Sequence, residues 1–132
     1  MIVTVDTHII IWEALEPGKL SKKAKHAFDR ANESDGLIFC DISLWEISML
    51  ITKKRLEIEI PFLEFIDLIR TTRNYTFQSI SPEIADISTN LGSEINSDPV
   101  DRIIAATAIY SNSLLITADQ NFINSKLVST IW

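Results

Sequence analysis

Short apolar runs in this chain alternate with longer segments in which apolar residues recur every three or four positions. The apolar runs predict four strands: Ile2–Val5, Leu37–Cys40, Tyr75–Ile80 and Leu114–Thr117. Leu127–Ile131 is a weaker candidate for a fifth strand. Short strands that are apolar throughout are typical of parallel sheets covered by helices on both faces.

The segments between these strands predict helices. They are Thr7–Leu15, Ser21–Ser34, Ser43–Lys53, Pro61–Arg73, Ser81–Leu91, Asp98–Asn112 and Asp119–Asn124. Strands that alternate with helices indicate an α/β fold, a three-layer α/β/α arrangement around a short, mainly parallel sheet of four to five strands. The chain has 132 residues, no repeat and no long linker, so we expect a single domain over residues 1–132.

Four carboxylates stand where a predicted helix begins: Asp6, Glu46, Asp101 and Asp119. The carboxyl ends of parallel strands form the ligand crevice of an open α/β sheet, so acids that are far apart in sequence can meet there. Converging carboxylates repel one another unless a positive charge lies between them. A hard divalent cation with oxygen ligands is the natural candidate.

Helix capping is the competing explanation for these acids. Asp is a favoured N-cap residue, which suits Asp6, Asp119 and also Asp98, the residue before a proline. Ser43 followed three residues later by Glu46 matches a capping box. Capping and ligand binding therefore both remain open for Asp6, Glu46 and Asp119.

Two of the acids have features that capping does not explain. Glu46 is the only ionisable residue between Asp41 and Lys53, and it shares a helical stripe with apolar residues. A buried carboxylate without a partner is costly, so Glu46 needs one. Asp101 precedes the run Ile103–Ala106, whose small residues predict a closely packed central helix. We therefore favour a functional role for Asp101.

The chemistry that suits these acids is metal-assisted hydrolysis of a phosphodiester. Mg²⁺ or Mn²⁺ lowers the pKa of a bound water and neutralises charge on the phosphate. No Ser–His or Cys–His pairing is evident as an alternative. A phosphohydrolase or receiver domain would need a Lys after a late strand, and none follows Leu114–Thr117 until Lys126. A non-catalytic binding module whose acids are caps is the main alternative.

The charge of the chain limits how it could bind nucleic acid. A net charge of −6 opposes broad, sequence-independent binding, which Lys and Arg drive. Part of that charge belongs to the candidate metal site. Arg102, beside Asp101, is expected either to pair with a carboxylate or to contact RNA phosphate. His8 is a weaker candidate for RNA contact, and we expect Trp12 and Trp45 to lie in the core.

The single cysteine, Cys40, excludes an internal disulfide and fits a reducing compartment. The N-terminus lacks the features of a signal peptide, and no apolar stretch approaches the roughly 20 residues of a membrane span. We therefore expect a cytoplasmic protein without a membrane partner.

The chain resembles PIN-domain ribonucleases, and more narrowly the VapC-type toxins of toxin–antitoxin pairs. The resemblance covers essentially the whole length. The segments that carry it are Val3–His8, Ser43–Ile47, Asp98–Ala108 and Leu115–Asp119, followed by Phe122. Each motif is loose, but their order and spacing together are specific.

The resemblance implies a PIN-like fold and an endoribonuclease that depends on Mg²⁺ or Mn²⁺. Its acidic quartet would be Asp6, Glu46, Asp101 and Asp119, with Asp98 as an additional acid. The hydroxyl residues Thr117 and Thr7 would each bond to a ligand carboxylate or to water. The resemblance also implies a cognate antitoxin whose tail covers the site, a homodimer, and a structured RNA substrate such as tRNA.

Overall fold

The computed structural model describes residues 1–132 and contains one five-stranded sheet in the order β3-β2-β1-β4-β5. The strands are β1 (Val3–Val5), β2 (Leu37–Cys40), β3 (Tyr75–Gln78), β4 (Leu114–Ile116) and β5 (Thr130–Ile131). All neighbouring strands are parallel, which confirms the predicted α/β fold. Val5 at the end of β1 pairs with Phe39 and with Ile116, so the chain leaves three strands at the same edge.

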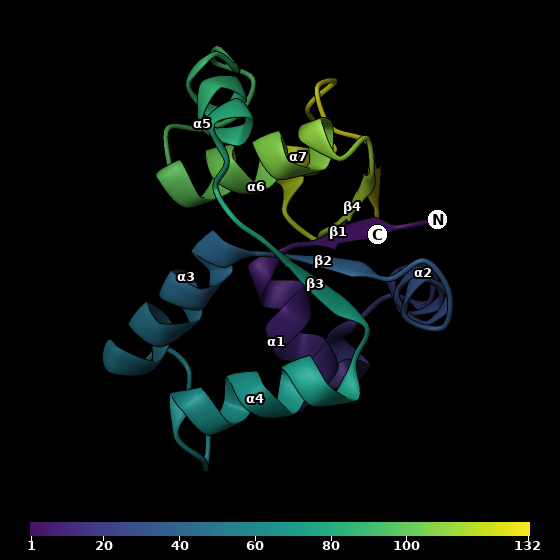
Figure 1. The fold of residues 1–132 in the computed structure, drawn as a ribbon, viewed down its shortest axis with the longest axis vertical. Coiled ribbons are helices and arrows are strands. Elements are labelled where there is room, and N and C mark those ends of the chain that lie inside the picture. Colours follow the sequence, from purple (N-terminus) through teal and green to yellow (C-terminus); the bar gives the residue numbers. More distant parts are fainter.

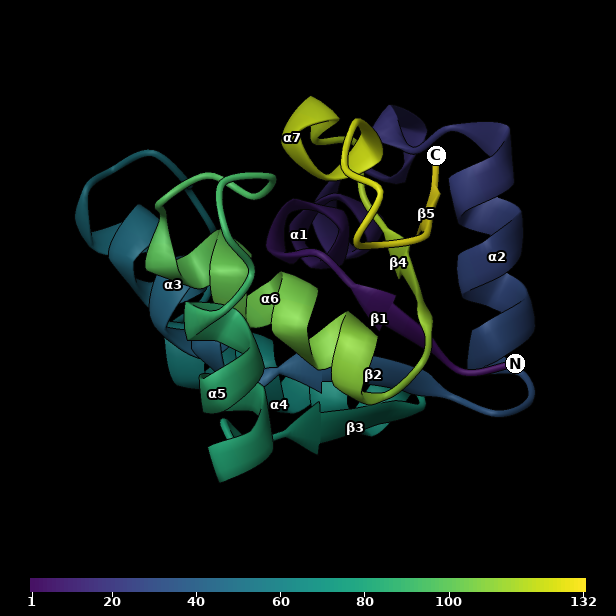
Figure 2. The same cartoon turned by 90° about the horizontal axis from the view of Figure 1, so that it is seen from above.

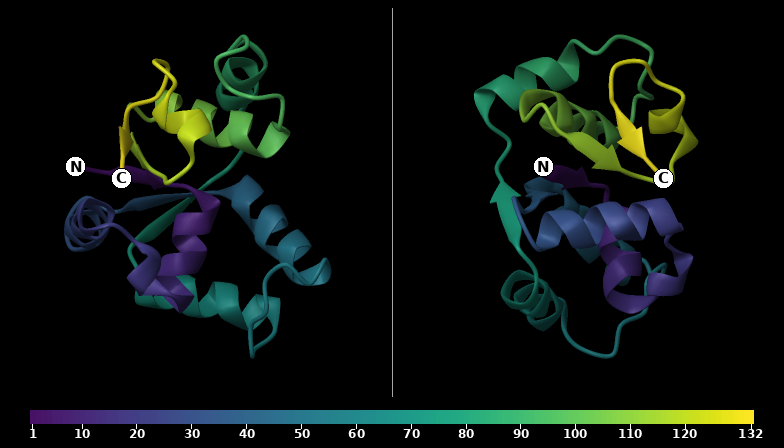
Figure 3. Two further views of the ribbon diagram at one scale, coloured as in Figure 1. Left: turned by 180° about the vertical axis from the view of Figure 1, so that it is seen from behind. Right: turned by 90° about the vertical axis from the view of Figure 1, so that its right-hand side faces the viewer.

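Helices cover both faces of this sheet. They are α1 (Thr7–Leu15), α2 (Lys22–Asn32), α3 (Asp41–Thr52), α4 (Phe62–Thr72), α5 (Pro82–Thr89), α6 (Pro99–Tyr110) and α7 (Gln120–Ile123), with a short 3₁₀ turn η1 (Pro17–Lys19). Helices α5, α6 and α7 lie on one side of the sheet, and α1, α3 and α4 lie on the other (Figure 1). The view from behind shows the same three layers (Figure 3).

Each helical layer encloses its own core. On one face, Ile9, Phe28 and Ile47 are fully buried against the strands and α4. On the other face, Ile104 of α6 packs with Leu115 of the sheet in the second core. Fully burying one such side chain contributes about 1.5–3 kcal/mol. The two cores hold the strand ends, and hence the residues that follow them, in fixed positions.

Helix α6 lies across the middle of the sheet with α5 beside it (Figure 2). The buried side chains of Ala105, Ala106 and Ala108 are small, so the α6 backbone lies close to the strands. The sequence predicted this central position from the same residues. This central position fixes the first turn of α6, where Asp101 lies, at the edge formed by the carboxyl ends of the strands.

The start of α3 differs from the sequence prediction. The helix begins at Asp41, directly after β2, and its N-cap Cys40 makes no side-chain capping bond. Ser43 therefore lies inside the helix, and the predicted capping box between Ser43 and Glu46 is wrong. The Ser43 hydroxyl instead bonds to the Thr7 hydroxyl at 2.7 Å, in a buried contact between α3 and α1.

Smaller differences follow from packing at the element ends. Pro61 is the N-cap of α4 rather than its first residue. The fifth strand is shorter than expected, since only Thr130 and Ile131 pair with β4. Trp45 is 58% exposed, so its predicted place in the core is wrong. None of the helices combines the length and apolar character that crossing a bilayer requires.

Candidate functional site

A cavity of about 400 Å³ brings the predicted acids together. Its lining consists of Asp6, His8, Trp12, Glu46, Asp98, Asp101, Ala118 and Asp119. The acids come from the ends of β1 and β4, from the middle of α3 and from the first turn of α6. The expected convergence at the carboxyl ends of the strands is therefore present, and we call this space the acidic cavity.

Asp6 is the most buried of these acids, with 7% of its surface exposed. It follows β1 and caps α1, with Oδ1 accepting a hydrogen bond from the Thr7 amide at 2.8 Å. Its Oδ2 accepts a bond from the Thr117 hydroxyl at 2.7 Å. Asp6 thus caps a helix and lines the cavity at the same time, so the two predicted explanations are compatible.

Burial raises the pKa of Asp6 from 3.8 to about 7. The hydrogen bonds from Thr117 and Thr7 lower this pKa, whereas the carboxylates of Asp101 and Glu46 raise it. Desolvation and nearby like charges both disfavour the ionised form. A cation in the cavity would counter both effects.

The N-terminus of α6 supplies two further acids. Asp98 is the N-cap, as predicted, and its Oδ1 accepts a bond from the Val100 amide at 3.0 Å. The Oδ2 of Asp101 accepts a bond from Asn96 Nδ2 at 2.9 Å. Burial raises the pKa of Asp101 to about 6; the Asn96 bond lowers it, and the acids at 98, 119 and 46 raise it. Asn96 carried no motif that the sequence analysis could detect.

Thr117 links Asp6 to Asp119. Asp119 caps α7 by accepting a bond from the Asn121 amide at 2.9 Å. The Asp119 amide donates to Thr117 Oγ1 at 3.0 Å, while the same hydroxyl donates to Asp6. The predicted bond from Thr117 to a cavity carboxylate is therefore confirmed. Thr7 does not make the corresponding bond, because its hydroxyl is paired with Ser43.

Glu46 reaches the cavity from α3, a helix that contributes no other lining residue. It lies in the middle of the helix and takes no part in an N-terminal capping box. Its charge raises the pKa of both Asp6 and Asp101, so the three carboxylates act on one another electrostatically.

The donor set of the cavity fits a hard divalent cation. Carboxylate oxygens are the ligands that Mg²⁺ and Mn²⁺ prefer, and the cavity lining contains neither Lys nor Arg. The acids line the cavity without closing around one point, since no three acidic, histidine or cysteine side chains lie close enough together to hold an ion as they stand. Mutual repulsion of uncompensated carboxylates gives a physical reason for this spacing.

Arg102 does not form the ion pair with a carboxylate that was one of the two contacts expected of it. Its guanidinium donates to the backbone carbonyls of Ser88, Gly92, Ile95 and Asn96 at 2.9–3.3 Å. These contacts hold the loop between α5 and α6, which carries the Asn96 partner of Asp101. The ion pair with a carboxylate is absent, and a guanidinium engaged in this way is poorly placed for RNA contact.

Two aromatic residues of α1 also line the cavity. His8 is exposed, and its ring lies 5.9 Å from that of Trp12. Trp12, which was expected in the core, is partly buried and packs against the edge of the first core. The sequence signal that could have identified this pair is its spacing, because residues four apart lie on the same face of a helix. The helix in question is α1, which Asp6 caps.

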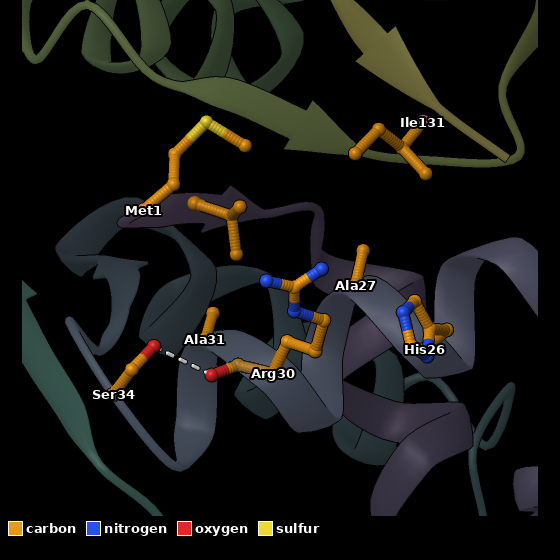
Figure 4. Close-up of a pocket in the computed structure, with 8 residues that line it drawn as sticks. Met1, His26, Ala27, Arg30, Ala31, Ser34 and Ile131 are labelled. Atoms are coloured by element: carbon orange, nitrogen blue, oxygen red, sulfur yellow. Dashed lines mark hydrogen bonds between the residues drawn. The ribbon is translucent and has the colours of Figure 1, made fainter.

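A separate cavity of about 270 Å³ lies between α2 and the sheet edge. The Arg30 side chain extends from α2 into this space, with Met1 and Ile131 on its far side (Figure 4). Its lining contains no carboxylate and is mostly apolar. The acidic cavity is therefore the better candidate for chemistry.

Known protein sequences resemble this chain along most of its length. The profile of the PIN domain family matches residues 3–126. Ribonuclease VapC22 of Mycobacterium tuberculosis is 32% identical over 118 residues, which cover 89% of this chain and 87% of that protein.

Solved structures share the fold. The structure of VapBC2 from Rickettsia felis bound to a promoter DNA fragment contains a chain with a TM-score of 0.74 and 16% identity, covering 98% of this chain and 97% of that one. A chain in a toxin–antitoxin complex from Klebsiella pneumoniae has a TM-score of 0.66 and 23% identity, covering 97% of this chain and 96% of that one. The acidic cavity thus occupies the carboxyl edge of a sheet that these proteins have in common, and the chain belongs to the VapC-type PIN-domain family.

Proposed function

We propose that this protein is a metal-dependent endoribonuclease and the toxin of a toxin–antitoxin pair. The observation that carries the proposal is the meeting of five acids in one cavity, two of them with pKa values raised by burial. The similarity to a ribonuclease along most of the chain supports it. Hydrolysis of RNA phosphodiesters is the chemistry that such a cavity serves best.

Asp6, Glu46, Asp101 and Asp119 would hold Mg²⁺ or Mn²⁺. The bound cation would supply a water of lowered pKa and neutralise charge on the scissile phosphate. Thr117 orients Asp6 through Oδ2, and Asn96 orients Asp101 through Oδ2. These neutral donors favour the ionised form of each carboxylate, which is the form that binds metal. Asp98 would remain an accessory acid at the rim.

We propose a cognate antitoxin and a second copy of the chain as protein partners. Support for the antitoxin comes from the solved structures, of which one contains VapBC2 bound to a promoter DNA fragment and another is a toxin–antitoxin complex. The exposed Trp45 of α3 would add apolar contact area to a homodimer. We further propose that residues 1–132 act as one domain, that the protein works in the cytoplasm, and that a structured RNA such as tRNA is the substrate.

The test is to map cellular RNA ends after induction of the wild type and of Asp6→Asn. New ends should appear with the wild type alone. Purified protein should cleave the same RNA in the presence of Mn²⁺, and the cleavage should stop when EDTA is added. Identical ends in both strains, or cleavage that survives in the Asp6→Asn, Asp101→Asn double variant, would reject the mechanism.

The alternative is a non-catalytic PIN-like binding module whose acids serve as helix caps. Asp6, Asp98 and Asp119 do cap helices, which gives this alternative a specific basis. It predicts no Mn²⁺-dependent cleavage and a loss of about 1 kcal/mol when a cap is replaced by Ala. Asn caps as well as Asp, so Asp6→Asn removes charge without removing the cap. Cleavage lost in Asp6→Asn without a loss of stability would exclude the alternative.

A further inference from the structure

A row of aromatic side chains leads away from the acidic cavity. His8 and Trp12 line the cavity. The centroid of the Trp12 ring lies 5.9 Å from that of His8 and 6.2 Å from that of Trp132. The three residues come from α1 and from the segment after β5, and we call them the aromatic row.

The rings of the aromatic row remain accessible. His8 is exposed, Trp12 is half-buried, and Trp132 is 36% exposed. The planes of neighbouring rings are tilted by 57° and 53°, so no ring lies flat on the face of the next. By contrast, Phe39 and Phe77 are stacked with an interplanar angle of 11°. His8 and Trp132 therefore offer exposed ring surface, while Trp12 also packs against the first core.

No cation lines the acidic cavity, since its lining has no Lys or Arg. Arg102 is engaged by carbonyls, and Arg73 pairs with Glu13 at 2.7 Å. Lys19 is the cation beside the row, with Nζ 5.7 Å from the centre of the Trp12 ring, and it also pairs with Glu16 at 3.3 Å.

This distribution of charge limits how RNA could be held. Contacts from Lys and Arg to phosphates are the usual source of affinity for nucleic acids. Since the cavity lining itself offers no cation for such a contact, other groups must contribute to the binding free energy. Stacking of bases on aromatic rings is the sequence-tolerant alternative.

We propose that the aromatic row is a stacking subsite for an unpaired nucleobase of the RNA substrate, next to the phosphodiester at the acidic cavity. The inference rests on the proposed function, because it takes the cavity as the place of cleavage. The base must be unpaired, since only an unstacked base can present its face to one of these rings, and Trp132 is the exposed one of the two tryptophans. Lys19 would contact the phosphate that follows this base.

Binding is tested separately from cleavage, in the Asp6→Asn background, with a fluorescently labelled single-stranded oligoribonucleotide. Trp132→Ala should weaken binding about tenfold, whereas Trp132→Phe should retain most of the affinity. Tyr110→Ala is the matched control, because Tyr110 is 47% exposed at the other end of α6. When Trp132 is present, an oligonucleotide with one abasic position should bind about tenfold more weakly than the intact oligonucleotide. Trp132→Ala should bind the two oligonucleotides with equal affinity.

Equal affinities of Trp132→Ala and Tyr110→Ala would overturn the proposal. So would a Trp132→Ala variant that loses binding to a copurifying antitoxin while its RNA affinity is unchanged, because the row would then be a protein-docking surface. The proposed function fails separately: wild-type protein that binds RNA through Trp132 but never cleaves it would leave the stacking subsite intact and reject the nuclease. Cleavage and binding that are both insensitive to Trp132 would reject the subsite alone.

Discussion

Thr117 donates a hydrogen bond to Asp6 Oδ2 at 2.7 Å across a sequence separation of 111 residues. The contact forms because parallel pairing of β1 with β4 places Val5 beside Ile116, so the next residues of both strands meet. The same hydroxyl accepts a bond from the Asp119 amide. One small side chain therefore sets the relative position of two proposed ligands.

Replacing Thr117 by Val should raise the pKa of Asp6 above its value of about 7. Val has the shape of Thr but no hydroxyl, so the ionised carboxylate loses its side-chain donor. Leaving that buried oxygen unpaired costs about 1–3 kcal/mol of folding free energy at a pH where Asp6 is charged. Carboxyl chemical shifts during an NMR titration and urea unfolding measure the two effects. Thr117→Ser is the control and should behave as the wild type; a Val variant with an unchanged titration would contradict the assignment.

Asp6 should make the metal-free protein less stable as the pH rises. Its pKa is 3.8 in an unfolded chain and about 7 in the fold, so the folded state binds the proton more tightly. The resulting stability is complete below about pH 4 and is lost as the pH passes through 7. We expect Asp6→Asn to remove this slope and to exceed the wild type at pH 8 by at most about 4 kcal/mol.

Chemical unfolding in EDTA from pH 4 to pH 8 tests this expectation. The informative quantity is the difference between wild type and Asp6→Asn, because Asp101 titrates in both proteins with a pKa raised to about 6. If the difference in unfolding free energy between the two proteins is independent of pH, burial does not raise the pKa of Asp6.

The buried pair of Thr7 and Ser43 should control the spacing of α1 and α3. Their hydroxyls are 2.7 Å apart, and the two helices carry Asp6 and Glu46. Ser43→Ala leaves the Thr7 hydroxyl unpaired and should cost about 1–3 kcal/mol, whereas the Thr7→Val, Ser43→Ala double variant should cost less than the sum of the single changes. Mn²⁺ affinity measured by calorimetry should fall in Ser43→Ala. Unchanged affinity with lowered stability would limit the pair to a packing role.

Arg102→Ala should destabilise the protein through the loop between α5 and α6. Its guanidinium donates to the Ser88 carbonyl of α5 and to three carbonyls of the loop, and only the contacts to Ser88 and Ile95 are part-buried. Leaving a buried carbonyl unpaired costs about 1–3 kcal/mol, and exposed carbonyls can bond to water instead. Arg102→Lys should not restore stability, because an ammonium lacks the planar fork. Hydrogen exchange of residues 92–96 should accelerate in both variants. If Arg102→Ala binds RNA more weakly but unfolds with the same free energy as the wild type, Arg102 contacts RNA phosphate instead.

Local patterns in the sequence were sufficient for much of the fold. The bounds of β2 and α1 agree with the predicted Leu37–Cys40 and Thr7–Leu15. Asp98 is the predicted cap of α6, and the acids of the quartet all line one cavity. The element bounds and the cap depend on side-chain period and capping chemistry, which are properties of neighbouring residues. The convergence of the acids could be expected because parallel strands end at the same edge of a sheet.

Only the tertiary structure decided which partner each polar or aromatic group would find. Ser43 could cap a helix or bond to Thr7, and the packing of α3 against α1 selected the bond. Arg102 met carbonyls because the loop before α6 folds back over it. Trp45 faces solvent, while Trp12 meets Trp132 from the opposite end of the chain. Contacts between residues far apart in sequence depend on how layers pack, and no local pattern encodes that packing.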